Sequence, residues 1–250
     1  MHNPIIVALD LPDPGKAIAL VDTLAAHIGA FKVGSELFTT AGPELIRRIR
    51  GTGASVFLDL KFHDIPNTVA KAVAAAVRLD VQMLTVHTSG GTAMLRAAEQ
   101  AGQQTAQELG RKPPLILGVT VLTSLDANDL SEVGLQPNVG RQVERLADLA
   151  AKAGLAGLVC SPLEVAGLRQ FLPSSMKLVT PGIRGPGDAV GDQKRTLSPV
   201  EAIAAGADWL VIGRPIYGAT DPGAVVQTIL TSLASEAASA PQPRGSRFSL

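Results

Sequence analysis

The chain has 250 residues, of which 46% are hydrophobic, and it carries 22 basic and 22 acidic residues. This composition supports a substantial core, while the balanced charge and the 3% of aromatic residues do not favour nucleic-acid binding. No apolar run reaches the roughly 18 residues of a membrane span, and the run at residues 5–9 is too short for a signal-peptide core. The single cysteine, Cys160, permits no internal disulfide and suits a reducing compartment. We therefore expect a cytoplasmic protein that binds neither nucleic acid nor a membrane.

Short apolar runs alternate with amphipathic stretches along the chain. The predicted strands are residues 5–10, 30–33, 55–61, 83–87, 115–119, 157–160, 178–180 and 209–212. The predicted helices are residues 15–27, 43–50, 66–79, 92–109, 139–153, 163–171, 199–205 and 222–235. Most of the strands are continuously apolar, which is typical of parallel strands covered on both faces. Strand–helix alternation without a break in composition predicts a single (β/α)8 TIM barrel of the α/β class, with a doubly wound open sheet as the alternative.

Two segments lie outside this alternation. Residues 180–198, which are rich in glycine, proline and charge, form a long loop after the seventh predicted strand, and loops of this length are often functional lids. Residues 237–250 have the composition of a flexible C-terminal tail. The sequence thus predicts one catalytic barrel domain over residues 1–236, followed by the tail.

Charged side chains recur where the predicted strands end. Asp10 closes the first strand, Lys32 lies in the second, and Asp59 and Lys61 end the third. Catalytic groups of TIM barrels gather at the carboxyl ends of the strands, and the two-residue period of a strand places Asp59 and Lys61 on one face. A structural ion pair would explain these two residues alone. Four charges at one barrel mouth carry a large desolvation cost, however, and this favours a functional site.

The segment after the third strand allows several interpretations. Asp64, taken alone, suits the N-cap of the helix that follows, and His63 suits a structural or solvent-facing role. A metal site is the alternative for this region, with His87, Asp59, His63 and Asp64 as its ligands. Against a metal site, the ammonium group of Lys61 would lie among these ligands and oppose a divalent cation.

The last two predicted strands lead into glycine–arginine segments. The seventh runs into VTPGIRG, with Gly182, Arg184 and Gly185, and the eighth runs into VIGRPIYGATDP, with Gly213 and Arg214. Glycine lets backbone N–H groups approach a ligand, and arginine binds oxyanions through two parallel hydrogen bonds. The loops after strands seven and eight of a TIM barrel frequently hold phosphate. Two such segments in these loops favour a phosphate site over surface arginines in glycine turns.

Six motifs occur in order along the chain: VALDLP, FKVGSELF, DLKFHDIPNTV, VTVLTSL, TPGIRG and IGRPIYGATDP. In their order and spacing the chain resembles the orotidine 5'-monophosphate decarboxylase family up to about residue 235. The resemblance implies decarboxylation of orotidine 5'-monophosphate to uridine 5'-monophosphate (UMP) and carbon dioxide, the last step of de novo pyrimidine synthesis. It also implies a homodimer that needs no metal and no organic cofactor.

The resemblance assigns catalytic roles to one group of residues. Lys61 matches the lysine that delivers the proton, and an alternating network consists of Lys32, Asp59, Lys61 and Asp64. Asp64 would reach into the site of the neighbouring subunit, accompanied by Ile65 and Thr68.

A second group would contact the substrate. Asp10 and Lys32 match ribose-hydroxyl contacts, and either Thr123 or Ser124 matches a contact to the pyrimidine. Three residues match phosphate-side contacts, with Arg184 close to them: Gln193, Gly213 and Arg214.

The implied reaction leaves a poorly delocalised carbanion at C6 of the pyrimidine, so that an enzyme without an electron-sink cofactor has to stabilise it electrostatically. A protonated Lys61 held by Asp59 and Asp64 can do this, and phosphate binding can close the loop at residues 180–198 over the base.

Three alternative functions remain. A related sugar-phosphate decarboxylase uses magnesium, but it has an acid where this chain has Lys32. The others are a ribulose-phosphate epimerase-like metal enzyme and a non-catalytic barrel that binds phosphate ligands.

Overall fold

The structure, a computed structural model, describes residues 3–185 and 195–239. Within these residues, parallel strands form a closed barrel in the order β1-β2-β3-β4-β5-β6-β7-β8. The strands are β1 Ile5–Ala8, β2 Ala30–Gly34, β3 Val56–Phe62, β4 Met83–His87, β5 Leu115–Val119, β6 Gly157–Val159, β7 Lys177–Thr180 and β8 Trp209–Ile212. The predicted (β/α)8 TIM barrel is therefore confirmed, and the open-sheet alternative is wrong.

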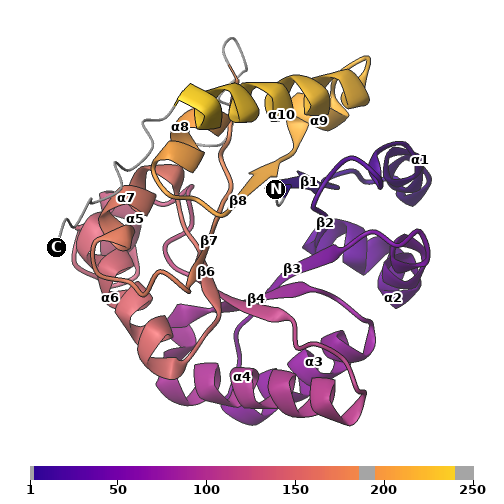
Figure 1. Ribbon diagram of the computed structural model, residues 1–250. Helices are drawn as coiled ribbons and strands as arrows, with labels where there is room; N and C mark the ends of the chain where they lie inside the picture. Colours follow the sequence, from indigo (N-terminus) through magenta and orange to yellow (C-terminus); the bar gives the residue numbers. More distant parts are fainter. Residues whose placement is uncertain (1–2, 186–194, 240–250) are drawn as a thin grey trace, which may run out of the picture.

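Helices follow the strands around the outside of the barrel (Figure 1). They are α1 Pro14–Leu24, α2 Ser35–Gly51, α3 Pro66–Arg78, α4 Gly91–Glu108, α5 Ala127–Glu132, α6 Val139–Ala153, α7 Val165–Arg169, α8 Pro199–Ala204, α9 Arg214–Tyr217 and α10 Pro222–Ser239. Two 3-10 turns, Thr88–Gly90 and Pro162–Glu164, precede α4 and α7. Helices α3 and α4 pack side by side, and α10 contacts α1, α8 and α9.

Helix α2 begins earlier than the sequence pattern predicts. The predicted start was Pro43, where proline suits a first helical turn, but the helix begins at Ser35 and is kinked at Gly42, whose φ is 66°. The kink separates the first turns of α2 from the amphipathic part that follows. The short helix α5 was not predicted, although Asp126 and Asp129 form a capping box at its start.

The core has two layers, because successive side chains of a strand point to opposite faces. The inward layer fills the barrel and consists of Ile6, Ala8, Ala30, Phe57, Met83, Leu117, Val179, Trp209 and Val211. The outward layer packs against the helices and includes Ile5, Val7, Val56 and Leu58. Asp59 follows Phe57 by two residues on β3, and both side chains line the cavity described below. The alternation that builds the core therefore also directs Asp59 into the barrel mouth.

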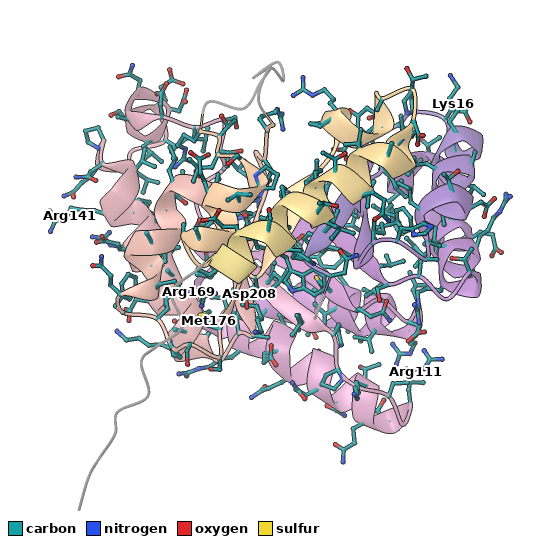
Figure 2. The ribbon with its side chains drawn as sticks, turned by 45° about the horizontal axis from the view of Figure 1, so that its top comes forward. Lys16, Arg111, Arg141, Arg169, Met176 and Asp208 are labelled. Carbon is teal, nitrogen blue, oxygen red and sulfur yellow. The ribbon has the colours of Figure 1, made fainter. Side chains whose placement is uncertain are left out.

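At the amino ends of the strands, Asp208 organises a second charged cluster. Its carboxylate forms an ion pair with Arg169, accepts a hydrogen bond from Lys177 Nζ at 2.9 Å and accepts the Leu178 N–H at 2.8 Å. Arg169 also donates to the carbonyl oxygens of Gly206 and Met176. Figure 2 shows Arg169, Met176 and Asp208 close together. This cluster connects β7 to the start of β8 at the end of the barrel opposite the carboxyl ends.

Replacing Asp208 with asparagine should lower the free energy of unfolding by about 1 to 2 kcal/mol, because two partly exposed cations lose their counter-charge. Burial tends to raise the pKa of Asp208, but the Leu178 N–H, Lys177 and Arg169 outweigh it and hold the pKa below its usual value. The contribution to stability is thus present above the unfolded pKa of about 4 and is lost as the pH falls through the lower folded value. Urea unfolding of the wild type and of Asp208→Asn, at several values from roughly pH 3 to pH 7, measures how this contribution changes with pH.

The matched control for this experiment is Asp148→Asn. Asp148 pairs with Lys152 at 2.6 Å on the exposed surface of α6, and such pairs contribute only about 0.3–0.5 kcal/mol. An equal loss of stability in both variants would contradict the role assigned to Asp208.

Several predicted features fall on residues outside the described ranges. Gln193 and most of the predicted lid, residues 186–194, are among them, as are residues 240–250 of the predicted tail. Helix α10 includes residues 237–239. Of the helices in the described ranges, none combines the length and apolar character needed to cross a membrane.

Candidate active site

A cavity of about 550 Å³ opens at the carboxyl ends of the strands. Among its lining residues are Asp10, Lys32, Asp59, Lys61, Thr123, Ser124, Arg184, Gly213 and Arg214, all of which the sequence analysis selects as site residues. On one side they come from β2, β3 and the segment just after β1, and on the other side from the segments after β5, β7 and β8. The cavity has the size of a small-molecule site.

The acids and bases on the β1–β3 side alternate in one connected network. Lys32 Nζ lies 2.8 Å from Asp10 Oδ1 and 3.6 Å from Asp59 Oδ2. Lys61 Nζ lies 2.9 Å from both carboxylate oxygens of Asp59. Asp59 therefore lies between the ammonium groups of Lys32 and Lys61, while Asp10 pairs with Lys32.

Burial and charge pairing compete in this network. Burial raises the pKa of Asp59, but the adjacent charges of Lys32 and Lys61 outweigh it and leave the pKa below its usual value. Burial likewise lowers the pKa of Lys32, and the charges of Asp59 and Asp10 outweigh it and leave that pKa raised. Each group is thus held in its charged form by its neighbours.

The backbone of β3 departs from regular strand geometry at Lys61. The residue has a φ of 51°, in the left-handed region that residues with a side chain rarely adopt. The pairing of β3 with β4 shifts register between Leu58 and Phe62, which indicates a β-bulge. Bulges often re-aim a side chain beside an active site. Here the irregular backbone carries Lys61, whose ammonium group contacts both carboxylate oxygens of Asp59.

Asp64 lies apart from this network in the single chain. It is exposed, and its carboxylate accepts the N–H of its neighbour Ile65 at 2.6 Å. Ile65 itself is the N-cap residue of α3, which has no side-chain cap, so the N-cap interpretation of Asp64 is wrong. Ile65 is 66% exposed and Thr68 is also exposed. These three residues do not line the cavity as the described residues form it.

His63 and His87 lie together beside the network. Their ring centroids are 5.6 Å apart, with the planes tilted by 42°. Burial, together with electrostatic interaction with the neighbouring His63 and Lys61, lowers the pKa of His87. Within residues 3–185 and 195–239, no three His, Cys, Asp or Glu side chains lie close enough to hold a metal ion. The metal interpretation of this region therefore has no complete ligand set in that part of the chain.

The opposite side of the cavity carries the two arginines. Arg184 follows Gly182, whose φ of 80° requires glycine, and its Nη1 donates to the Ile183 carbonyl oxygen at 2.7 Å. Gly213 is the N-cap residue of α9, which begins at Arg214. A Cβ at Gly213 would lie only 3.3 Å from the ring of Tyr217, so glycine keeps this part of the wall open.

Sequence reasoning missed the link between Arg195 and the loop after β5. Arg195 forms an ion pair with Glu164, and its Nη2 donates to the Leu122 carbonyl oxygen at 3.2 Å. Glu164 in turn accepts the Ser161 N–H at 2.8 Å. Leu122 lines the cavity next to Thr123 and Ser124. Nothing in the spacing of these residues predicts the contact, because they come from three separate loops.

A closed (β/α)8 barrel with a charged cavity at the carboxyl ends of its strands defines a TIM-barrel enzyme. A protein-family match over residues 3–229 identifies the kind of TIM-barrel enzyme more closely. The chain belongs to the orotidine 5'-phosphate decarboxylase / HUMPS family.

Individual relatives agree with this family. The chain is 49% identical to the orotidine 5'-phosphate decarboxylase of Paramagnetospirillum magneticum, over 93% of this chain and 99% of that protein. It is 51% identical to the protein of the same name from Opitutus terrae, over 94% of this chain and 100% of that one. Among solved structures, the orotidine 5'-phosphate decarboxylase of Lactobacillus acidophilus superposes with a TM-score of 0.83 at 36% identity, covering 92% of this chain and 99% of that chain.

Proposed function

We propose that the protein is a carbon–carbon lyase that converts orotidine 5'-monophosphate to UMP and carbon dioxide, the final step of de novo pyrimidine synthesis. Family membership and the relatives named orotidine 5'-phosphate decarboxylase support this activity. The observation that carries the proposal is the chain of contacts from Asp10 through Lys32 and Asp59 to Lys61 at the cavity wall. The single cysteine, Cys160, is buried and forms no disulfide, which suits the proposed cytoplasmic location.

In the proposed reaction, the bond between C6 of the pyrimidine and its carboxylate breaks, and the electron pair stays on C6. The ammonium group of Lys61 stabilises this charge and then transfers a proton to C6, which gives UMP and leaves a neutral amine that is reprotonated by solvent. Asp59 holds the ammonium group in place through two contacts of 2.9 Å. Charged groups that are held in place by ion pairs and hydrogen bonds can stabilise a developing charge with little reorganisation.

The rest of the cavity suits the other parts of the nucleotide. Asp10, whose side chain is half exposed, and its ion-pair partner Lys32 would contact the ribose hydroxyls. Thr123 or Ser124 would contact the pyrimidine from the loop after β5. Arg184 and Arg214, with Gly213 and with Gln193 as predicted from the sequence, would bind the phosphate on the far side. A phosphate held there fixes the distance from the base to Lys61.

Replacing Arg214 with alanine should raise the KM for orotidine 5'-monophosphate and the Kd for UMP by about 10- to 100-fold, because a charge-assisted contact worth roughly 1.5–3 kcal/mol is lost. Binding of uridine, which has no phosphate, should be unchanged. Isothermal titration with UMP and with uridine measures both. The control is Arg141→Ala, whose side chain is exposed at the start of α6. An equal loss of affinity for uridine and UMP would contradict the phosphate assignment.

We further propose that the enzyme is a homodimer with sites shared across the interface. Asp64, Ile65 and Thr68 are exposed in the single chain, and Ile65 is a large apolar residue with 66% of its surface accessible. These are the three residues that the resemblance to the family assigns to the subunit interface. In such a dimer, Asp64 of one subunit would complete the network around Lys61 of the other.

The activity is tested by following the ultraviolet absorbance of orotidine 5'-monophosphate with purified, chelator-treated protein. Conversion to UMP that survives chelation supports the proposal and excludes the magnesium-dependent sugar-phosphate decarboxylase and the epimerase-like metal enzyme. Tight UMP binding without any conversion would instead support the non-catalytic barrel. In the proposed enzyme, Lys32 lies between two acids, where the magnesium-dependent relative has an acid.

A further inference from the structure

Thr85 is a polar residue at the centre of strand β4, between Leu84 and Val86, with none of its surface exposed. Its hydroxyl group makes two contacts with the charged network. The backbone N–H of Lys61 donates to Thr85 Oγ1 at 2.8 Å. Thr85 Oγ1 donates to Asp59 Oδ1 at 3.0 Å. One buried hydroxyl thus contacts both the backbone of Lys61 and the carboxylate of Asp59.

The directions of these two hydrogen bonds are fixed by the chemistry of the groups. A backbone N–H can only donate and an ionised carboxylate can only accept, while a hydroxyl does both with a single hydrogen. Burial raises the pKa of Asp59, but Lys32, Lys61 and the hydrogen bonds from Lys61 and Thr85 outweigh it, so that the carboxylate is ionised. The hydroxyl hydrogen of Thr85 is therefore donated to Asp59.

The bulge in β3 explains why Lys61 needs this partner. Leu58 pairs with Leu84 and Phe62 pairs with Val86, so that three residues of β3 lie opposite Thr85 alone. The bulge removes regular ladder partners from this stretch. A buried backbone N–H group without a hydrogen-bond partner is costly. At Lys61, the hydroxyl oxygen of Thr85 accepts the hydrogen bond from the backbone N–H in place of a carbonyl oxygen of β4.

The contacts close a ring around Lys61. From its backbone N–H the ring passes through Thr85 Oγ1 to Asp59 Oδ1, and from there over 2.9 Å to Lys61 Nζ. The backbone N–H of Lys61, through Thr85, and its ammonium group, directly, are thereby both connected to the carboxylate of Asp59. The backbone end is in the left-handed conformation, with a φ of 51°, which a residue with a side chain keeps only when its surroundings impose it.

We propose that Thr85 is a positioning residue for the decarboxylation: its hydroxyl group holds the bulged backbone of Lys61 and the carboxylate of Asp59 together, so that the ammonium group points into the cavity. This inference rests on the proposed function and adds to it a residue that is not expected to touch the substrate. Thr85 is absent from the cavity lining formed by the described residues.

Three variants test the proposal. Thr85→Val keeps the shape of the side chain and removes its hydroxyl, Thr85→Ser keeps the hydroxyl, and Thr88→Val is the matched control. Thr88 is also fully buried, but its hydroxyl donates to the backbone carbonyl oxygen of Val119 instead of to a charged side chain. For each variant we would measure kcat and KM for orotidine 5'-monophosphate, the Kd for UMP, and the melting temperature.

Thr85→Val should lower kcat about 10- to 100-fold through misplacement of Lys61, while KM and the Kd for UMP stay within about threefold of the wild-type values. Thr85→Ser should retain kcat within about threefold, and Thr88→Val should retain it as well. If Thr85→Val does not fold, Thr85→Ala takes its place with the same expectation.

Two results would overturn the role of Thr85 while leaving the proposed function intact. One is a Thr85→Val enzyme with kcat close to that of an active wild type. The other is an equal loss of kcat in Thr85→Val and Thr85→Ser, or in Thr85→Val and Thr88→Val, since the hydroxyl would then not be the cause. A wild-type chain without any turnover would overturn the proposed function and this inference with it.

Discussion

Replacing Lys61 with alanine lowers kcat for orotidine 5'-monophosphate by about 10⁴-fold or more, because the variant loses both the stabilising charge and the proton donor. UMP still binds, since the ribose and phosphate sides of the cavity do not depend on this residue. The removal of one cation also leaves the buried Asp59, which is 8% exposed, with Lys32 as its remaining close counter-charge. Steady-state kinetics and isothermal titration with UMP measure the two effects separately.

The control for this experiment is Lys152→Ala. Lys152 is exposed on α6 and pairs with Asp148 far along the chain from the network, so its removal should leave kcat unchanged. Turnover by Lys61→Ala at a rate near that of the wild type would refute the role of Lys61. A loss of UMP binding equal to the loss of turnover would show that the substitution disrupts the cavity rather than the reaction.

Mixed dimers of Lys61→Ala and Asp64→Ala subunits should regain activity, although each variant alone is almost inactive. If Asp64 acts across the interface, one of the two sites in a hybrid dimer contains both an intact Lys61 and an intact Asp64. Statistical mixing of equal amounts makes half of the dimers hybrid, so the expected recovery is roughly a quarter of wild-type activity. The measurement is turnover after the two variants are unfolded and refolded together.

A chain that carries both substitutions provides the control for the mixing experiment. Mixed with Lys61→Ala chains, it forms no site that has both residues intact, and activity should stay at the background level. Absence of recovery in the first mixture, in a preparation shown by mass spectrometry to contain hybrids, would contradict sharing of sites across the dimer.

The barrel could be predicted from the sequence because its strands are short, continuously apolar and separated by amphipathic stretches. The two-residue period of a strand also predicted that Asp59 and Lys61 share one face, and the structure brings their charged groups together at 2.9 Å. Local pattern is sufficient here, since a buried strand in a barrel has one face in the core and the other against helices.

The details around Lys61 could not be predicted because they depend on the neighbouring strand. The bulge and the φ of 51° arise from the pairing of β3 with β4, and no local signal distinguishes Thr85 from an ordinary strand threonine. A polar residue within a buried apolar run was the one available indication. The N-cap interpretation of Asp64 was wrong by one residue, because α3 begins at Pro66 and Ile65 occupies the N-cap position.

Hydrogen exchange at C6 of UMP tests whether the ammonium group of Lys61 supports a carbanion at that carbon. By microscopic reversibility, the neutral amine of Lys61 can remove the C6 proton of UMP, and in heavy water the site then gains deuterium. Proton magnetic resonance should show the C6 signal decaying with the wild-type protein and persisting with Lys61→Ala. The same rate of exchange with both proteins would contradict the mechanism.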